Sequence, residues 1–150
     1  AVMKTAVVQI ITAAIGTLGF SIYFRVSEKN VFASTLGGAL GWGVYLLVDK
    51  IGGILFLSNF IAALFVYLYS EFFARRLKAP ANIFLIPGII PLLPGNALYY
   101  MMSGLVQGDG AMFAQYGKNT AIITVGIAAG IAVGAVCMMY FAKTKEPKIK

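Results

Sequence analysis

The residues best suited to chemistry in this chain are three closely spaced prolines, Pro87, Pro91 and Pro94. They lie in an apolar and uncharged segment, residues 82–104. A proline has no backbone N–H and collides with the carbonyl four residues before it, so each one disturbs a helix. The carbonyls affected here are those of Ile83, Pro87 and Ile90. Such carbonyl oxygens can accept hydrogen bonds from the polar groups of a substrate, which predicts a binding or conduction path along a broken helix.

Polar and flexible residues next to the prolines support this prediction. Gly88 and Gly95 loosen the backbone further, and Asn96 and then Tyr99 come shortly after the last proline. Asn59 lies near the middle of another apolar segment, where its amide needs a partner in a neighbouring helix or a wet cavity. The predicted path residues are Pro87, Gly88, Ile90, Pro91, Pro94, Gly95, Asn96, Tyr99 and Asn59. The alternative is a kinked helix that only packs on its neighbours.

Other kinds of chemistry lack the residues they need. The chain has no histidine and a single cysteine, Cys137, and no apolar segment carries a charge at its centre. A zinc site, a bis-histidine haem and an internal disulfide are therefore excluded, and we expect no metal and no cofactor. Because no nucleophile stands with a base and no carboxylates cluster, the sequence does not indicate an enzyme.

The elements that must position these residues are membrane helices. Apolar residues make up 60% of the chain, charged residues 11%, and the mean hydropathy is +0.87. We predict an all-α membrane protein with one transmembrane domain, residues 1–150, that ends in a basic tail, 143–150. The segments near the roughly 20 residues needed to cross a bilayer are about 5–24, 31–48, 51–70, 82–104 and 120–142. The first segment, 5–24, is longer than the apolar core of a signal peptide, so we expect it to be a transmembrane span that is not cleaved. Met3 is the expected native start.

The distribution of Lys and Arg predicts how these segments cross. With five crossings, nine basic residues fall on one side and three on the other. If 82–104 instead dips in and returns, the split becomes six against six. We therefore predict five spans, with the N-terminus outside, the C-terminus cytoplasmic and the break near the bilayer midplane. The net charge of +7 is spread over segment ends, which does not favour nucleic-acid binding.

Glycines and a charged pair describe the expected packing. Small residues spaced four apart let membrane helices approach closely. Those expected to pack helices are Gly37, Gly41, Gly126, Gly130 and Gly134. Glu71 and Arg75 have the spacing of a helical ion pair. Asp109 is expected to be a turn residue in a glycine-rich outer loop.

The stretch "APANIFLIPGIIPLLPGNALYYMMSGLVQGD" resembles the C-terminal membrane module of the threonine/serine exporter family. The specific similarity is the run Pro87-Gly88, then Pro91-Leu92-Leu93-Pro94-Gly95, then Tyr99. In length and segment count the whole chain is similar to the small subunit of that family's two-component form. The resemblance implies export of threonine, serine or a small dicarboxylate such as succinate, driven by an ion gradient. It also implies a larger membrane subunit that resembles the family's N-terminal module.

An odd number of spans independently suggests a partner. Two directly joined five-span units sit in opposite orientations, the arrangement of the inverted repeats that build transport sites. The leading hypothesis is therefore a subunit of a secondary exporter in the bacterial inner membrane, surrounded by lipid and with a higher oligomer left open. The alternatives are a homo-oligomeric channel subunit and a structural or assembly protein without transport activity.

Overall fold

The computed structural model describes residues 2–143, with side chains from Lys4 to Phe141, and every regular element in that part of the chain is helical. In chain order the helices are α1 (Val2–Tyr23), α2 (Glu28–Lys50), α3 (Leu55–Leu77), α4 (Asn82–Ile89), the 3₁₀ turn η1 (Ile90–Leu92), α5 (Gly95–Gln107) and α6 (Gly110–Lys143). The prediction of an all-α protein is confirmed. Most of the predicted basic tail, residues 144–150, lies outside the described residues.

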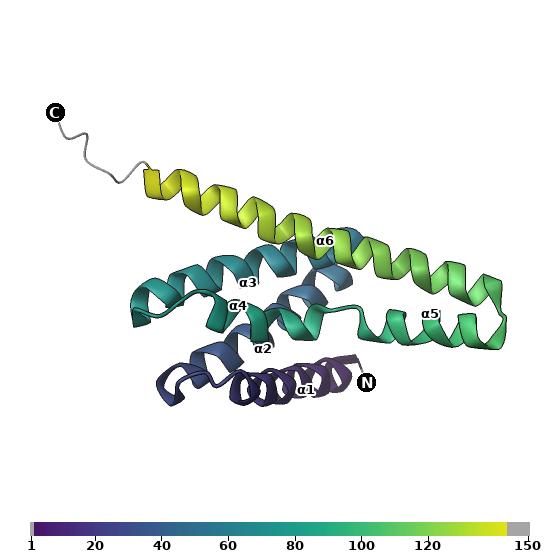
Figure 1. The fold of residues 1–150 in the computed structure, drawn as a ribbon, viewed down its shortest axis with the longest axis horizontal. Helices are drawn as coiled ribbons and strands as arrows, with labels where there is room; N and C mark the ends of the chain where they lie inside the picture. Colours follow the sequence, from purple (N-terminus) through teal and green to yellow (C-terminus); the bar gives the residue numbers. More distant parts are fainter. Residues whose placement is uncertain (1, 144–150) are drawn as a thin grey trace.

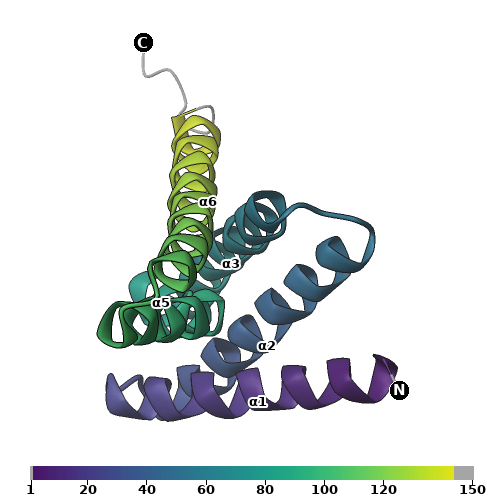
Figure 2. The ribbon, with the colours of Figure 1, turned by 90° about the vertical axis from the view of Figure 1, so that its right-hand side faces the viewer.

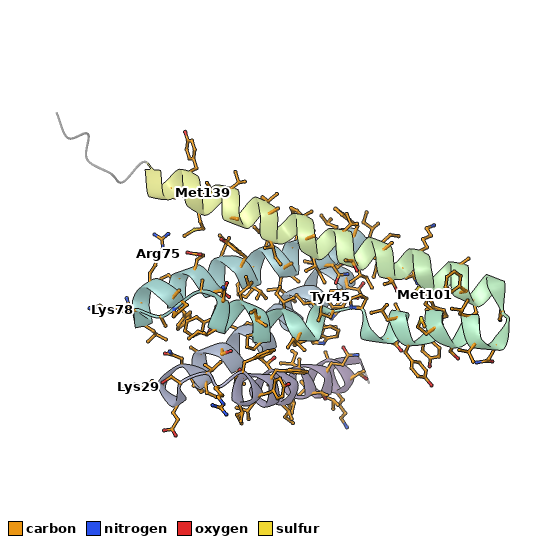
Figure 3. The ribbon with its side chains drawn as sticks, in the orientation of Figure 1. Lys29, Tyr45, Arg75, Lys78, Met101 and Met139 are labelled. Carbon is orange, nitrogen blue, oxygen red and sulfur yellow. The ribbon has the colours of Figure 1, made fainter. Side chains whose placement is uncertain are left out.

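Four of these helices are long and apolar enough to cross a membrane, namely α1, α2, α3 and α6. The pair Asn82–Leu92 and Gly95–Gln107 passes the same test together but is bent by 51°. If this bent pair is one span, the total is five. Three cations assigned to the predicted cytoplasmic side, Lys29, Arg75 and Lys78, lie at the same end of the molecule (Figure 3).

The third span begins later than predicted. Instead of 51–70 it covers Leu55–Leu77, because the apolar residues 51–54 form the connection between α2 and α3. Gly52 has a φ of +94°, which a glycine adopts without steric cost, and the Gly53 N–H donates to the Val48 carbonyl at 2.9 Å. Hydropathy alone cannot distinguish an apolar turn from the start of a helix.

The fifth span begins earlier than predicted, at Gly110 instead of residue 120. The prediction of a long glycine-rich outer loop before it is therefore wrong. Only Gly108 and Asp109 connect α5 to α6. The Asp109 carboxylate accepts a hydrogen bond from the Met112 N–H at 3.0 Å, as an N-capping residue does. Asp109 is thus a turn residue, as expected, but in a much shorter turn.

Helix α6 is consequently very long. Its 34 residues span about 51 Å at 1.5 Å per residue, against a hydrocarbon layer of about 30 Å. One part packs on α3 and another on α5. The hairpin of α5 with the start of α6 extends beyond the other helices at one end (Figure 1).

Glycines lie where helices approach most closely. On α6, a Cβ added to Gly126 would stand 2.9 Å from the Phe56 carbonyl oxygen, and one added to Gly134 would stand 2.6 Å from the Tyr67 ring. Gly130 is equally close to the backbone of α3. The three glycines therefore form the face of α6 that packs on α3.

The glycines of α2 lie against residues of α1 and α3. Gly37 faces the Tyr69 ring and Gly41 faces Val66, both on α3. Gly38, between them, lies against Thr17 of α1. Since α4 also packs on α2, this helix is central to the bundle.

At the end of α3, Arg75 Nε lies 3.7 Å from Glu71 Oε2, which confirms the predicted ion pair.

Candidate functional site

The first proline of the broken span leaves a carbonyl that a neighbouring helix already uses. Pro87 lies inside α4 and cannot donate to the Ile83 carbonyl. The Ser34 hydroxyl of α2 donates to that oxygen at 3.2 Å, and its own oxygen is 2.9 Å from the Ser21 hydroxyl of α1. Ser21 and Ser34 are fully buried. The Ile83 carbonyl is therefore part of the packing of three helices and is not free for a substrate.

The carbonyl affected by the last proline also has a donor within the protein. Pro94 cannot donate to the Ile90 carbonyl, but the Leu93 N–H does so at 3.1 Å and closes the 3₁₀ turn. Leu93 then adopts an extended conformation, with φ −61° and ψ 142°, before α5 begins at Gly95. The expectation that all three proline-affected carbonyls are free is thus wrong for Ile83 and Ile90, since local and interhelical donors occupy them.

The predicted path residues do not gather at one place. Pro87, Gly88 and Pro94 are buried, while Gly95, Asn96 and Tyr99 are exposed on the far side of the break. A Cβ added to Gly88 would stand 2.9 Å from Val66 Cγ1, which places this glycine against α3. The structure therefore divides these residues into a buried group, Pro87 and Gly88 on α4 with Pro94 just before α5, and an exposed group on α5.

Asn59 lies elsewhere, between α3 and α6. It is only 3% exposed, and a Cβ added to Gly126 would stand 3.4 Å from the Asn59 Cβ. Its amide nitrogen donates to the Leu55 carbonyl of its own helix at 2.7 Å. The preceding turn of α3 thus supplies an acceptor for the amide nitrogen.

Ile90 and Pro91 line a hollow beside the broken span. This cavity of about 330 Å³ is bounded by α1, α2 and η1. Its lining residues are Gln9, Thr12, Ala13, Gly16, Trp42, Ile90 and Pro91. The lining is mainly apolar and contains no charged residue. Small-molecule sites commonly combine an apolar wall with a few polar groups.

The crossing of α1 and α2 creates this cavity. The two helices pack closely at Thr17 and Gly38 and at Ser21 and Ser34. From there they diverge toward the N-terminus of α1 (Figure 2). The sequence carried a signal for the α1 wall, since Gln9, Thr12 and Gly16 have the spacing of one helical face. It carried no signal that Pro91 would lie opposite them.

Two buried polar atoms in the described part of the chain have no hydrogen-bond partner, Thr35 Oγ1 and Trp42 Nε1. Both belong to α2, and their spacing of seven residues places them on one face. The Trp42 ring stacks on Tyr45, with centroids 4.9 Å apart and an interplanar angle of 27°. Native proteins satisfy nearly all buried polar groups, so these two atoms are exceptions within the described part of the chain.

A comparison with protein-family models identifies the family of this chain. The family model described as "Threonine/Serine exporter, ThrE" matches residues 9–137, which include every residue lining the cavity and the whole broken span. No solved structure matches the chain. With its apolar helices and a match over most of its length, the chain is a multi-pass membrane protein that belongs to the threonine/serine exporter family.

Proposed function

We propose that this chain is the smaller membrane subunit of a secondary exporter for small polar metabolites, and that the cavity between α1, α2 and η1 is its part of the substrate path. The substrates would be threonine and serine or a small dicarboxylate such as succinate. The observation that carries the proposal is the position of the cavity, which lies where the broken span meets two other helices in a chain of an exporter family. Broken helices supply the substrate sites of many secondary transporters.

The lining of the cavity supports the need for a partner subunit. No charged residue lines it, yet the proposed substrates are zwitterions or anions. Moving an ionised group from water into an uncharged apolar site costs many kcal/mol unless a countercharge or several hydrogen bonds compensate. A larger membrane subunit that faces the exposed side chains of Gln9 and Thr12 could supply these groups.

The proposed topology follows from the charges. If the bent pair is one span, the chain crosses five times, with the N-terminus outside and nine of the twelve Lys and Arg residues on the cytoplasmic side. The membrane would be the bacterial cytoplasmic membrane. Two five-span units in opposite orientation would then form the transport site between them.

Two glycines of α1 allow a matched test. A Cβ added to Gly16 or to Gly19 meets no atom within 4 Å, but only Gly16 lines the cavity. Gly16→Leu should therefore fill the cavity without disturbing the helix packing, while Gly19→Leu leaves it open. In vesicles containing this chain and its partner, loaded with labelled threonine, serine or succinate, we expect Gly16→Leu to slow release about tenfold or more. Gly19→Leu should release solute at nearly the wild-type rate.

Four results would contradict parts of the proposal. Normal release by Gly16→Leu, or an equal loss in both variants, would remove the cavity from the path. Absence of release by the wild-type pair would contradict the exporter function itself. Release by this chain alone that persists after the ion gradient is collapsed would instead favour a channel.

A further inference from the structure

We propose that the outward face of α5 is a docking surface for the same face of a second copy of this chain. The surface is a stripe formed by Tyr99, Met102 and Val106, with Leu98 and Leu105 along one edge. The three stripe residues are 69%, 50% and 83% exposed. The proposal concerns the assembly of the chain and does not depend on the exporter function.

The stripe points away from α6, the helix on which α5 mainly packs. The opposite face of α5 makes that contact. There Tyr100 stacks on Tyr116 with ring centroids 5.0 Å apart, and Gly104 lies against the backbone of Phe113. Side chains three and four positions apart share one face of a helix, so the stripe residues lie together on the other face. No helix of the chain covers this face.

The position of the hairpin means that lipid cannot cover the whole stripe. The 23 residues of α3 span about 34 Å, which already crosses a hydrocarbon layer of about 30 Å. Gly126 of α6 lies against Phe56 at the start of α3, and residues 110–125 extend about 24 Å past this point. A bilayer that holds α3 therefore leaves most of the hairpin outside its hydrocarbon layer (Figure 1). An apolar stripe at that height needs a protein surface to exclude water.

The pattern and charge of the stripe fit a second copy of the same helix. Spacings that alternate between three and four residues form the seam of paired helices. Copies of one membrane protein insert in the same orientation, so their α5 helices run parallel and place identical residues opposite one another. Because α5 carries no charged residue, this contact brings no like charges together. A contact through the α6 side of the hairpin would instead oppose the exposed Lys118 of each copy.

Cysteine cross-linking in membranes tests this symmetric contact. In the full chain, Cys137 is replaced by serine and single cysteines are introduced, with the larger subunit present or absent. A disulfide between two copies at the same position needs Cα atoms within about 7 Å, which a parallel seam provides. We expect Met102→Cys and Val106→Cys to form the dimer at least about fivefold faster than two controls on the polar edge of α5. The controls, Asn96→Cys and Gln107→Cys, are at exposed positions too.

Two cross-linking results would overturn the proposal. Equal rates at all four positions would mean that copies only collide and that the stripe has no fixed partner. Slower cross-linking at Met102 and Val106 than at the controls, seen when the larger subunit is present, would mean that the larger subunit covers the stripe.

A pair of acidic substitutions supplies a second readout. Val106→Glu places like charges opposite one another in the seam, whereas Gln107→Glu adds the same charge at the adjacent residue on the polar edge. We expect Val106→Glu to lower the association constant of the copies about tenfold or more, and Gln107→Glu to change it less than about threefold. Energy transfer between labelled copies, measured in liposomes over a range of protein densities, gives this constant. Equal effects of the two variants, or a wild-type chain that stays monomeric at every density, would refute the interface.

Export measured on the same preparations separates this proposal from the proposed function. Selective cross-linking of the stripe without any export supports the interface and contradicts the exporter function. Export by a chain that shows no selective cross-linking refutes the interface and leaves the exporter function standing.

Discussion

The two halves of the broken span are both uncharged, but their surroundings are very different. The first half, α4 with η1, packs on α1, α2 and α3 and buries Phe84, Pro87, Gly88, Ile89 and Leu92. The second half, α5, packs chiefly on α6. Its side chains Tyr99 and Val106 are 69% and 83% exposed. The break thus separates a helix held inside the bundle from one that leaves it.

This difference changes the interpretation of the prolines. In lipid an unpaired carbonyl is costly, so each break needs compensating donors. Around α4 these come from Ser34 and from the 3₁₀ turn that ends at Leu93. Pro91 is left as the proline that borders the cavity. A broken membrane helix therefore need not present every affected carbonyl to a substrate.

The largest expected contrast between the two halves involves their glycines. In Gly88→Leu the added side chain meets Val66 at once, whereas a Cβ added to Gly95 has no atom within 4 Å. We expect Gly88→Leu to lower the free energy of unfolding by about 1–3 kcal/mol through overpacking. Gly95→Leu should change it by less than about 0.5 kcal/mol. Unfolding by SDS in mixed micelles, followed by circular dichroism, measures both. Equal losses would mean that α5 is packed as tightly as α4.

A smaller contrast is expected between two adjacent residues of α2. Ser34→Ala removes the donor to the Ile83 carbonyl and should cost about 0.5–2 kcal/mol of unfolding free energy. Thr35→Val removes a buried hydroxyl oxygen that has no partner, so stability should stay the same or rise by up to about 1 kcal/mol. The same unfolding assay compares them. If Thr35→Val proved the more destabilising of the two, the described hydrogen bonding of α2 would be wrong.

The smallest effect is expected on α5. There the Gln107 amide donates to the Ser103 hydroxyl at 2.6 Å on an exposed face. Because exposed pairs within a helix contribute little, Ser103→Ala should cost less than about 0.5 kcal/mol. A loss as large as that of Ser34→Ala would remove the distinction between the two halves. All these variants should be measured in micelles of the same composition, so that their free energies of unfolding can be compared directly.

Local features were predictable from the sequence. The break after η1, the Glu71–Arg75 pair and the helical character of the apolar segments depend on residues within a few positions of one another. Errors arose where local patterns are ambiguous. Residues 51–54 are apolar but form a turn, and the glycines after Gln107 resemble a loop although α6 begins at Gly110.

The candidate site was less predictable. Asn59 and Asn96 were reasonable choices as polar residues in apolar segments, but one lies between α3 and α6 and the other is exposed on α5. The depth of a residue in its own segment does not reveal which helix it will face. Only contacts between distant parts of the chain decide that.

The sequence by itself thus determined that this chain is an all-helical membrane protein, where its fourth segment breaks, and which family it resembles. Hydropathy, the geometry of proline and a local motif suffice for these conclusions. The tertiary structure alone decided that Gln9, Trp42 and Pro91 meet around one cavity. The close approach of Gly38 to Thr17 sets the angle between α1 and α2, and packing of this kind depends on the shapes of side chains far apart in sequence.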